Sequence, residues 1–257
     1  MTETKSSNNL SFWDHLEELR GCLIYSVLVL LVSFIVLFFF KGFIFDTVVL
    51  GPSRSDFWLY RLLGLDMSVT LINIEITAQF FIHIKVTFFA ALVVTFPYLI
   101  YELWHFVAPA LYDNEKSAIR RAFGMGAGLF YLGVAFGYFV VMPVMLFFFE
   151  GYQVSESVQN TFSLTSYIGI FSSMVMLMGI LFEFPTLIVV LSKFGVVNRD
   201  LLRRSRKYAV MAVLVLSAVV TPSGDPFTML IVAAPLYVLY EFSIFLCKNE
   251  VPEGSES

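Results

Sequence analysis

The sequence predicts an all-α polytopic membrane protein of about six transmembrane helices, with both termini on the inner side of the membrane. Three observations support this prediction. Hydrophobic residues make up 58% of the chain and charged residues only 14%, with a mean hydropathy of +0.82, whereas a soluble domain is about one quarter charged. Apolar runs long enough to cross a bilayer recur along the chain. Basic residues gather in alternate links between these runs.

The first element expected is an amphipathic helix that begins near residue 11. Ser11 as N-cap and Asp14 at the third helical position form a capping-box pattern. Leucines fall on one face, and Glu17 and Glu18 on the other. We therefore expect residues 1–20 to form a cytoplasmic segment that lies along the interface, residues 21–248 a membrane domain and residues 249–257 a cytoplasmic tail.

The spans follow from the apolar runs. They are expected near residues 22–40, 82–107, 122–149, 167–191 and 227–247. Another run, residues 208–220, has about 13 residues and reaches about 20 Å, against a hydrocarbon core of about 30 Å. This run is therefore too short to span unaided. The turn that follows it, residues 221–226, contains Asp225, which is expected to cap the last helix.

Orientation follows from the basic residues. The N-terminal segment, the links near residues 113–121 and 193–207, and the C-terminal tail carry most of them. By the positive-inside rule these segments face the cytoplasm. The link after the first span, residues 41–66, is too polar to lie in lipid and is expected to face out.

Two glycine pairs in the third span, Gly124 with Gly128 and Gly133 with Gly137, have the small-xxx-small spacing that lets helices approach closely in lipid. We expect packing inside the protein. A contact between subunits is the alternative.

Acidic residues at the inner face suggest a binding site. Glu18 and Glu115 present carboxylates from neighbouring elements, where two guanidinium groups could dock in bidentate fashion. This arrangement predicts a receptor for a basic peptide. The structural alternative is that Glu115 stabilises a helix N-terminus and that Glu17 pairs with Arg20.

The ionisable residues inside the spans differ in how strongly they indicate a function. Lys85 and Glu102 lie near the ends of the second span and can reach the interface, so they are weak indications of function. Glu183 lies well inside the fourth run and precedes Phe184-Pro185, so a helix irregularity is expected beside a costly carboxyl group. A functional role is expected there, with a neutral structural carboxyl as the alternative.

Several function classes are excluded by what the sequence lacks. It contains no HExxH, GxSxG or P-loop motif, and its histidines, including His83, lie in separate segments without metal-ligand spacing. Cys22 and Cys247 are expected to be structural. We therefore expect no enzyme activity, no metal, no cofactor and no nucleic-acid partner.

The motifs together resemble the TatC family of the twin-arginine protein translocase. They occur in the family's order over most of the chain. They are His15-Leu-Glu-Glu-Leu-Arg20, the segment 104–112 with Glu115, the segment 138–143, Phe182-Glu-Phe-Pro185, and Thr221-Pro222 with Asp225. The turn that contains Thr221-Pro222 and Asp225 is one residue longer than the Thr-Pro-Pro-Asp turn that is commoner in the family. The family resemblance implies that both of the last two helices are short.

The resemblance implies a non-enzymatic receptor that binds twin-arginine signal peptides of folded cargo. It would work in several copies with single-span partners of the TatA and TatB type, in the bacterial inner membrane, driven by the proton-motive force. The positions that the resemblance implies for signal-peptide binding are Glu18, Glu115, Arg20 and Phe106, and those for transport or partners are Pro52, Glu183 and Asp225. The alternative is a proton-coupled secondary transporter that uses Glu183, with helices broken at Phe96-Pro97 and Phe184-Pro185.

Overall fold

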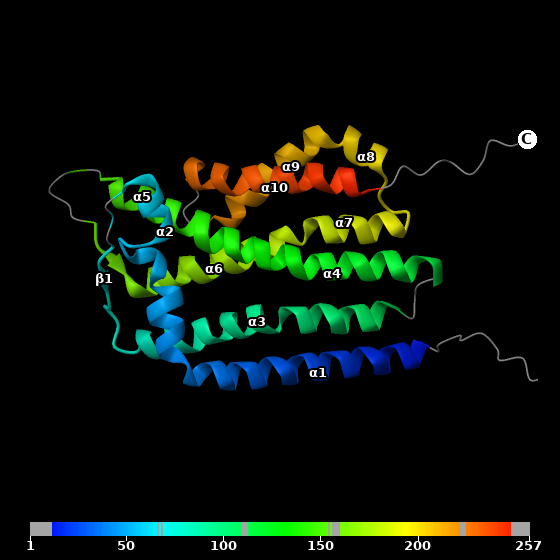
Figure 1. Ribbon diagram of the computed structural model, residues 1–257, viewed down its shortest axis with the longest axis horizontal. Helices are drawn as coiled ribbons and strands as arrows, with labels where there is room; N and C mark the ends of the chain where they lie inside the picture. Colours follow the sequence, from blue (N-terminus) through cyan, green and yellow to red (C-terminus); the bar gives the residue numbers. More distant parts are fainter. Residues whose placement is uncertain are drawn as a thin grey trace, which may run out of the picture.

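The computed structural model describes residues 12–65, 67, 69–108, 113–153, 155, 160–221 and 225–247. Long helices run side by side in an elongated bundle, and shorter elements close one end of it (Figure 1). We call the end where α1 (Phe12–Phe39) begins and α10 (Pro226–Leu246) finishes the terminal end, and the opposite end the cap end.

Five stretches are long and apolar enough to cross a membrane, and they confirm the predicted positions of the main spans. They are Leu16–Phe39, Ala78–Val107, Ile119–Gly151, Leu164–Lys193 and Pro226–Leu246. The first stretch belongs to α1. The elements that form the four stretches after it are α3 (Ala78–Val107), α4 (Asp113–Phe136), η4 (Gly137–Val141), α5 (Met142–Gly151), α6 (Leu164–Phe182), α7 (Phe184–Lys193) and α10.

The predicted short run is α9 (Arg206–Val220), which follows the six-residue α8 (Arg199–Arg204). Its 15 residues reach about 22 Å, less than the hydrocarbon thickness of about 30 Å. α10 has 21 residues and reaches about 31 Å. The prediction that both last helices are short therefore holds for α9 and is wrong for α10, whose apolar run continues to Leu246.

The N-terminal segment differs from the prediction. α1 is one continuous helix from Phe12 to Phe39, so the expected N-terminal helix runs without a break into the first span. Gly21 leaves the helix intact because a single helical glycine costs only about 1 kcal/mol relative to alanine. The predicted N-cap, Ser11, lies outside the described residues.

The cap end is built from the link that follows α1. That link contains the π-helix η1 (Phe43–Val49), the 3-10 turn η2 (Gly51–Ser53), the short helix α2 (Trp58–Leu63) and strand β1 (Leu71–Ile72). β1 pairs in parallel with β2 (Phe162–Ser163), with Leu71 opposite Phe162. This short pairing connects the link after α1 to the start of α6.

Three tyrosine hydroxyls fasten this link. Tyr60 donates to the Pro52 carbonyl at 2.9 Å, Tyr138 to the Val48 carbonyl at 2.9 Å, and Tyr167 to the Val49 carbonyl at 2.6 Å. Burial raises the pKa of the Tyr60 hydroxyl, which keeps its proton available for donation. Irregular backbone close to a membrane thus finds its hydrogen-bond partners inside the protein.

Glycines let α4 approach α6 closely. A β-carbon on Gly133 would lie 2.4 Å from the Met178 carbonyl oxygen, and one on Gly137 would lie 3.1 Å from the Val175 α-carbon. The prediction of internal packing is confirmed for this pair. It is wrong for Gly124 and Gly128, which are exposed and would meet nothing within 4 Å. The buried glycine of that run is Gly126, two positions along, because the helix rotates by about 100° per residue.

Candidate functional site

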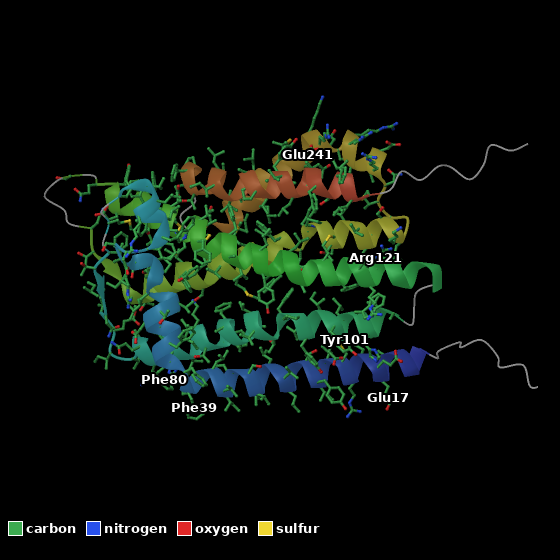
Figure 2. The ribbon with its side chains drawn as sticks, in the orientation of Figure 1. Glu17, Phe39, Phe80, Tyr101, Arg121 and Glu241 are labelled. Atoms are coloured by element: carbon green, nitrogen blue, oxygen red, sulfur yellow. The ribbon has the colours of Figure 1, made fainter. Side chains whose placement is uncertain are left out.

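A polar pocket lies between α1 and α3 at the terminal end, with a volume of about 330 Å³. We call it the carboxylate pocket. It is lined by Glu18, Gly21, Cys22, Tyr25, Tyr101, Glu102, His105 and Phe106. On each helix the lining positions are three or four residues apart, so each helix contributes one face. Figure 2 labels Tyr101 on α3 and Glu17 on α1 in this half of the bundle, opposite Phe39 and Phe80 at the cap end.

The carboxylate pocket brings together two acidic side chains from different helices. Glu18 is exposed on α1 and Glu102 is half-buried on α3. The Tyr98 hydroxyl donates to Glu102 Oε1 at 2.5 Å, which holds that carboxylate in place. Neither lysine nor arginine is among the lining residues. The pocket therefore offers an acidic, partly sheltered site for a cation.

Aromatic rings form the rest of the wall. The Tyr101 and His105 rings stack nearly parallel, with centroids 6.4 Å apart and planes inclined by 16°. Tyr25 and Phe106 complete the lining from α1 and α3. Flat aromatic faces beside carboxylates suit a planar cation better than a compact one, because a guanidinium stacks on aromatic faces and hydrogen-bonds at its edge.

The structure brings some of the predicted signal-binding residues together. Glu18 and Phe106 line the carboxylate pocket, whereas Arg20 is exposed on α1 outside the lining. Glu115 belongs to the first turn of α4, which begins at the terminal end (Figure 1). The Glu115 side chain lies outside the described part of the structure.

Glu102 is the residue that reasoning from the sequence undervalued. Its place near the end of a span suggested a side chain that merely reaches the interface. In the structure it faces the same pocket as Glu18. Its spacing of four from Phe106 was a usable signal, because residues four apart share a helix face. The neighbouring position of α1 and α3 could not be read from the spacing.

Two predicted positions lie at the cap end, far along the chain from the pocket residues. Pro52 is buried in η2, and its carbonyl accepts the Tyr60 hydroxyl. Asp225 caps α10: its Oδ1 accepts the Thr228 backbone N–H at 2.7 Å, which confirms the predicted cap. Pro222, in the same turn, lies outside the described residues. Both described residues therefore have a local structural role.

The prediction of a helix irregularity at Glu183 is confirmed. α6 ends at Phe182 and α7 begins at Phe184, with Pro185 in its first turn. Glu183 Oε1 is buried and has no hydrogen-bond partner in the described part of the chain. A β-carbon on Gly126 would lie 2.7 Å from Glu183 Oε2, so the carboxyl group packs against α4.

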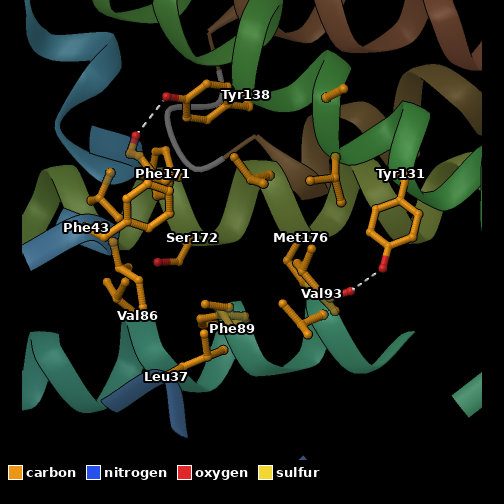
Figure 3. Close-up of a pocket in the computed structure, with 18 of the residues that line it drawn as sticks. Leu37, Phe43, Val86, Phe89, Val93, Tyr131, Tyr138, Phe171, Ser172 and Met176 are labelled. Atoms are coloured by element: carbon orange, nitrogen blue, oxygen red, sulfur yellow. Dashed lines mark hydrogen bonds between the residues drawn. The ribbon is translucent and has the colours of Figure 1, made fainter. Parts of the chain in front are cut away.

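A larger, apolar cavity is separate from both acidic positions. It has a volume of about 650 Å³ and lies among α1, η1, α3, α4, η4 and α6. Figure 3 shows its lining, with Phe89, Val93, Phe171 and Met176 facing the space. Neither Glu18 nor Glu183 lines it. Its apolar walls offer no charged group to a ligand.

Metal chemistry has no support in the described residues: none of their histidine, cysteine and acidic side chains form a group of three or more that could hold an ion. Cys22 is half-buried and Cys247 is buried, and both are free thiols.

Comparison with known proteins agrees with this architecture. The family model for the Sec-independent protein translocase protein (TatC) matches residues 14–235. TatC of Blattabacterium sp. subsp. Periplaneta americana is 36% identical over 254 residues, covering 93% of this chain and 95% of the relative. TatC of Escherichia coli K12 is 32% identical over 240 residues, covering 93% and 89%.

A solved structure, the crystal structure of the twin-arginine translocase receptor TatC in the detergent DDM, is also similar. The TM-score is 0.76 at 34% identity, and the match covers 91% of this chain and 99% of the other. The matches extend over nearly the whole bundle, including α1, α3 and the interrupted α6–α7 crossing. This chain therefore belongs to the TatC family, and it is a multi-pass, non-enzymatic subunit of the Sec-independent protein translocase.

Proposed function

We propose that this chain binds the twin-arginine signal peptides of folded cargo at the terminal end of the bundle, with Glu18 and Glu115 as acceptors for the two arginines. The observation that carries the proposal is the carboxylate pocket, in which Glu18 and Phe106 meet at the end of the bundle where α4 also begins. The similar solved structure is that of a twin-arginine translocase receptor, which supports such a role.

The chemistry favours arginine over other cations. An arginine presents a rigid fork of N–H donors that matches a carboxylate in bidentate geometry, whereas lysine is a point charge. An exposed acidic site at the cytoplasmic face of a membrane is unusual, because anionic head groups repel acidic side chains there. A basic signal peptide is attracted to the same surface.

The same proposal sets the orientation and the partners. The terminal end faces the cytoplasm of a bacterial inner membrane, so residues 1–20 and 249–257 are cytoplasmic and residues 21–248 form the membrane domain. Several copies assemble with single-span partners of the TatA and TatB type, and transport uses the proton-motive force. The short α9, with 15 residues, supports local thinning of the bilayer where cargo crosses.

A binding assay with purified protein tests this function. We expect a fluorescent twin-arginine peptide to bind the wild-type chain, its Lys-Lys variant to bind at least about tenfold more weakly, and the Glu18→Ala, Glu115→Ala double variant to lose binding. Glu17→Ala is the matched control, because Glu17 is an exposed carboxylate of the same helix outside the pocket lining. Equal binding in all arms would overturn the proposal.

The alternative of a proton-coupled transporter has less support. It expected helices broken at Phe96-Pro97 and at Phe184-Pro185, but α3 continues unbroken through Pro97, whereas the α6–α7 crossing is interrupted. Membership of the translocase family also favours protein export. The unpaired buried Oε1 of Glu183 is the observation that favours the alternative. Solute-dependent proton flux in proteoliposomes, lost in Glu183→Gln, is the result that would revive it.

A further inference from the structure

We propose that Glu102 is a specificity-determining residue of the signal site, and that one signal arginine is held between Glu18 on α1 and Glu102 on α3. This inference rests on the proposed function and adds a residue to it. Its basis is that both carboxylates line one pocket of about 330 Å³, together with flat aromatic rings, among them the His105 imidazole, and with no lysine or arginine in the lining.

The number and placement of hydrogen-bond donors on a guanidinium fit this arrangement. It carries five N–H donors along two edges and can therefore be held by two carboxylates at once. Glu102 is prepared for this role because Tyr98 already occupies its Oε1, which fixes the side chain and leaves Oε2 as an acceptor. Within the described residues no basic side chain forms an ion pair with Glu102.

The aromatic wall adds discrimination against lysine. The stacked Tyr101 and His105 rings present flat faces beside the two carboxylates. A guanidinium plane stacks on such a face while its edges remain free for hydrogen bonds. A lysine ammonium would keep one charge contact and lose both the second carboxylate and the stacking geometry.

The volume of the carboxylate pocket limits it to one arginine. At 330 Å³ it is at the lower end of the range of about 300–1,000 Å³ for small-molecule pockets. We therefore assign one arginine side chain to this pocket. The second arginine therefore binds outside this pocket, where Glu115 at the start of α4 is the proposed acceptor.

A double-mutant cycle between protein and peptide tests the assignment. We expect Glu102→Gln to weaken binding of the twin-arginine peptide about tenfold, since it removes one charged acceptor. Two further peptides replace the first or the second arginine by lysine. The peptide in which lysine replaces the arginine that enters the pocket should bind Glu102→Gln as well as it binds the wild type, because the interaction with Glu102 is already lost. The other peptide should bind Glu102→Gln about tenfold more weakly than it binds the wild type.

Two variants keep the result interpretable if Glu102→Gln alters folding. Tyr98→Phe keeps the charge but releases Glu102 Oε1, and should weaken binding by about threefold. Glu17→Gln removes an exposed carboxylate outside the pocket lining and should bind like the wild type. Loss of binding in Glu18→Gln with wild-type affinity in Glu102→Gln would overturn this inference and leave the proposed function intact. Loss of arginine preference in the wild-type chain would overturn both.

Cys22 gives a second readout that needs no change in the acidic residues. It lines the carboxylate pocket and is half-buried, whereas the other thiol, Cys247, is buried. Saturating twin-arginine peptide should slow maleimide labelling of Cys22 at least about fivefold, and the Lys-Lys peptide at the same concentration should not. An unchanged labelling rate with peptide bound would show that the arginine binds elsewhere.

Discussion

The two ends of the bundle use the same residue type in opposite ways. At the cap end, the Tyr60, Tyr138 and Tyr167 hydroxyls donate to backbone carbonyls of the link after α1. At the terminal end, Tyr98 donates to a side-chain carboxylate and Tyr101 lines an open pocket. Tyrosine thus fastens backbone at the cap end and arranges a charged group beside the carboxylate pocket. Between α10 and α8 the Tyr240 hydroxyl also donates to a backbone carbonyl, that of Leu202, at 2.6 Å, so the contrast concerns α1 and α3.

The difference has a physical cause. The link at the cap end contains π and 3-10 segments, whose carbonyls lack regular helical partners and must be satisfied inside the protein. At the terminal end α1 and α3 are regular helices, so their backbones need no such help. Polar side chains there remain available to a ligand. We therefore expect substitutions toward the cap end to affect stability and those at the terminal end to affect binding.

The largest effect on stability is expected from Gly133→Ala. The new β-carbon would lie 2.4 Å from the Met178 carbonyl oxygen, a backbone atom that cannot turn aside. Overpacking of this kind costs about 3 kcal/mol. Gly124→Ala, toward the terminal end of the same helix, meets nothing within 4 Å and should leave stability unchanged or raise it by up to about 1 kcal/mol. Thermal unfolding in detergent measures both, and equal losses would contradict the contrast.

The next effect is expected from Tyr60→Phe. The Tyr60 side chain is 1% exposed, and its hydroxyl lies 2.9 Å from the Pro52 carbonyl and 3.3 Å from the Pro143 carbonyl. Removing the hydroxyl leaves buried acceptors unsatisfied and should cost about 2 kcal/mol of unfolding free energy. Tyr101→Phe, at a position that is 59% exposed, should cost less than about 0.5 kcal/mol.

Both tyrosine variants can be compared by chemical unfolding in the same detergent. A Tyr101 variant that is as unstable as the Tyr60 variant would mean that the Tyr101 hydroxyl stabilises the fold as the Tyr60 hydroxyl does. A Tyr60 variant that unfolds like the wild type would remove the role assigned to the cap end.

The features predictable from the sequence were those that depend on neighbours along the chain. The spans follow from apolar runs, the break at Glu183 from the proline two residues later, and the cap at Asp225 from its place before a helix. Each is decided within a few residues. The start of α1 at Phe12 agrees with the predicted cap, but its unbroken continuation into the first span was missed, because the acidic face suggested an interfacial segment while nothing in residues 12–39 breaks the helix.

The features that could not be predicted depend on which helix faces meet. A shift of one residue turns a side chain by about 100° around its helix. The Gly124–Gly128 spacing was sound, yet Gly126 is the residue that packs against α7. Likewise Glu102 joined Glu18 only because α1 and α3 are neighbours with those faces opposed. Hydropathy fixes neither the neighbour nor the rotation.

A smaller effect is expected at Asp225, where charge and capping can be separated. Asp225→Ala removes the acceptor for the Thr228 N–H at 2.7 Å and should cost about 1 kcal/mol. Asp225→Asn retains an N-cap acceptor and should be nearly neutral in stability. If Asp225 acts in export only through the fold, the Asn variant exports a twin-arginine reporter normally. Normal stability with lost export would instead assign a role to its charge.

The smallest effect is expected from the ion pair between α9 and α10. Arg206 and Glu241 lie 2.7 Å apart, but their side chains are 49% and 34% exposed. Exposed pairs contribute about 0.5 kcal/mol or less, because water screens the charges and ordering two long side chains costs entropy. Arg206→Gln should therefore lower the free energy of unfolding by no more than that. Glu241 also accepts the Tyr237 hydroxyl at 3.1 Å, so Glu241→Gln should cost slightly more. If the effect of Arg206→Gln persists at high salt, the pair is less screened than its exposure implies, and α9 is held to α10 by charge as well as by packing.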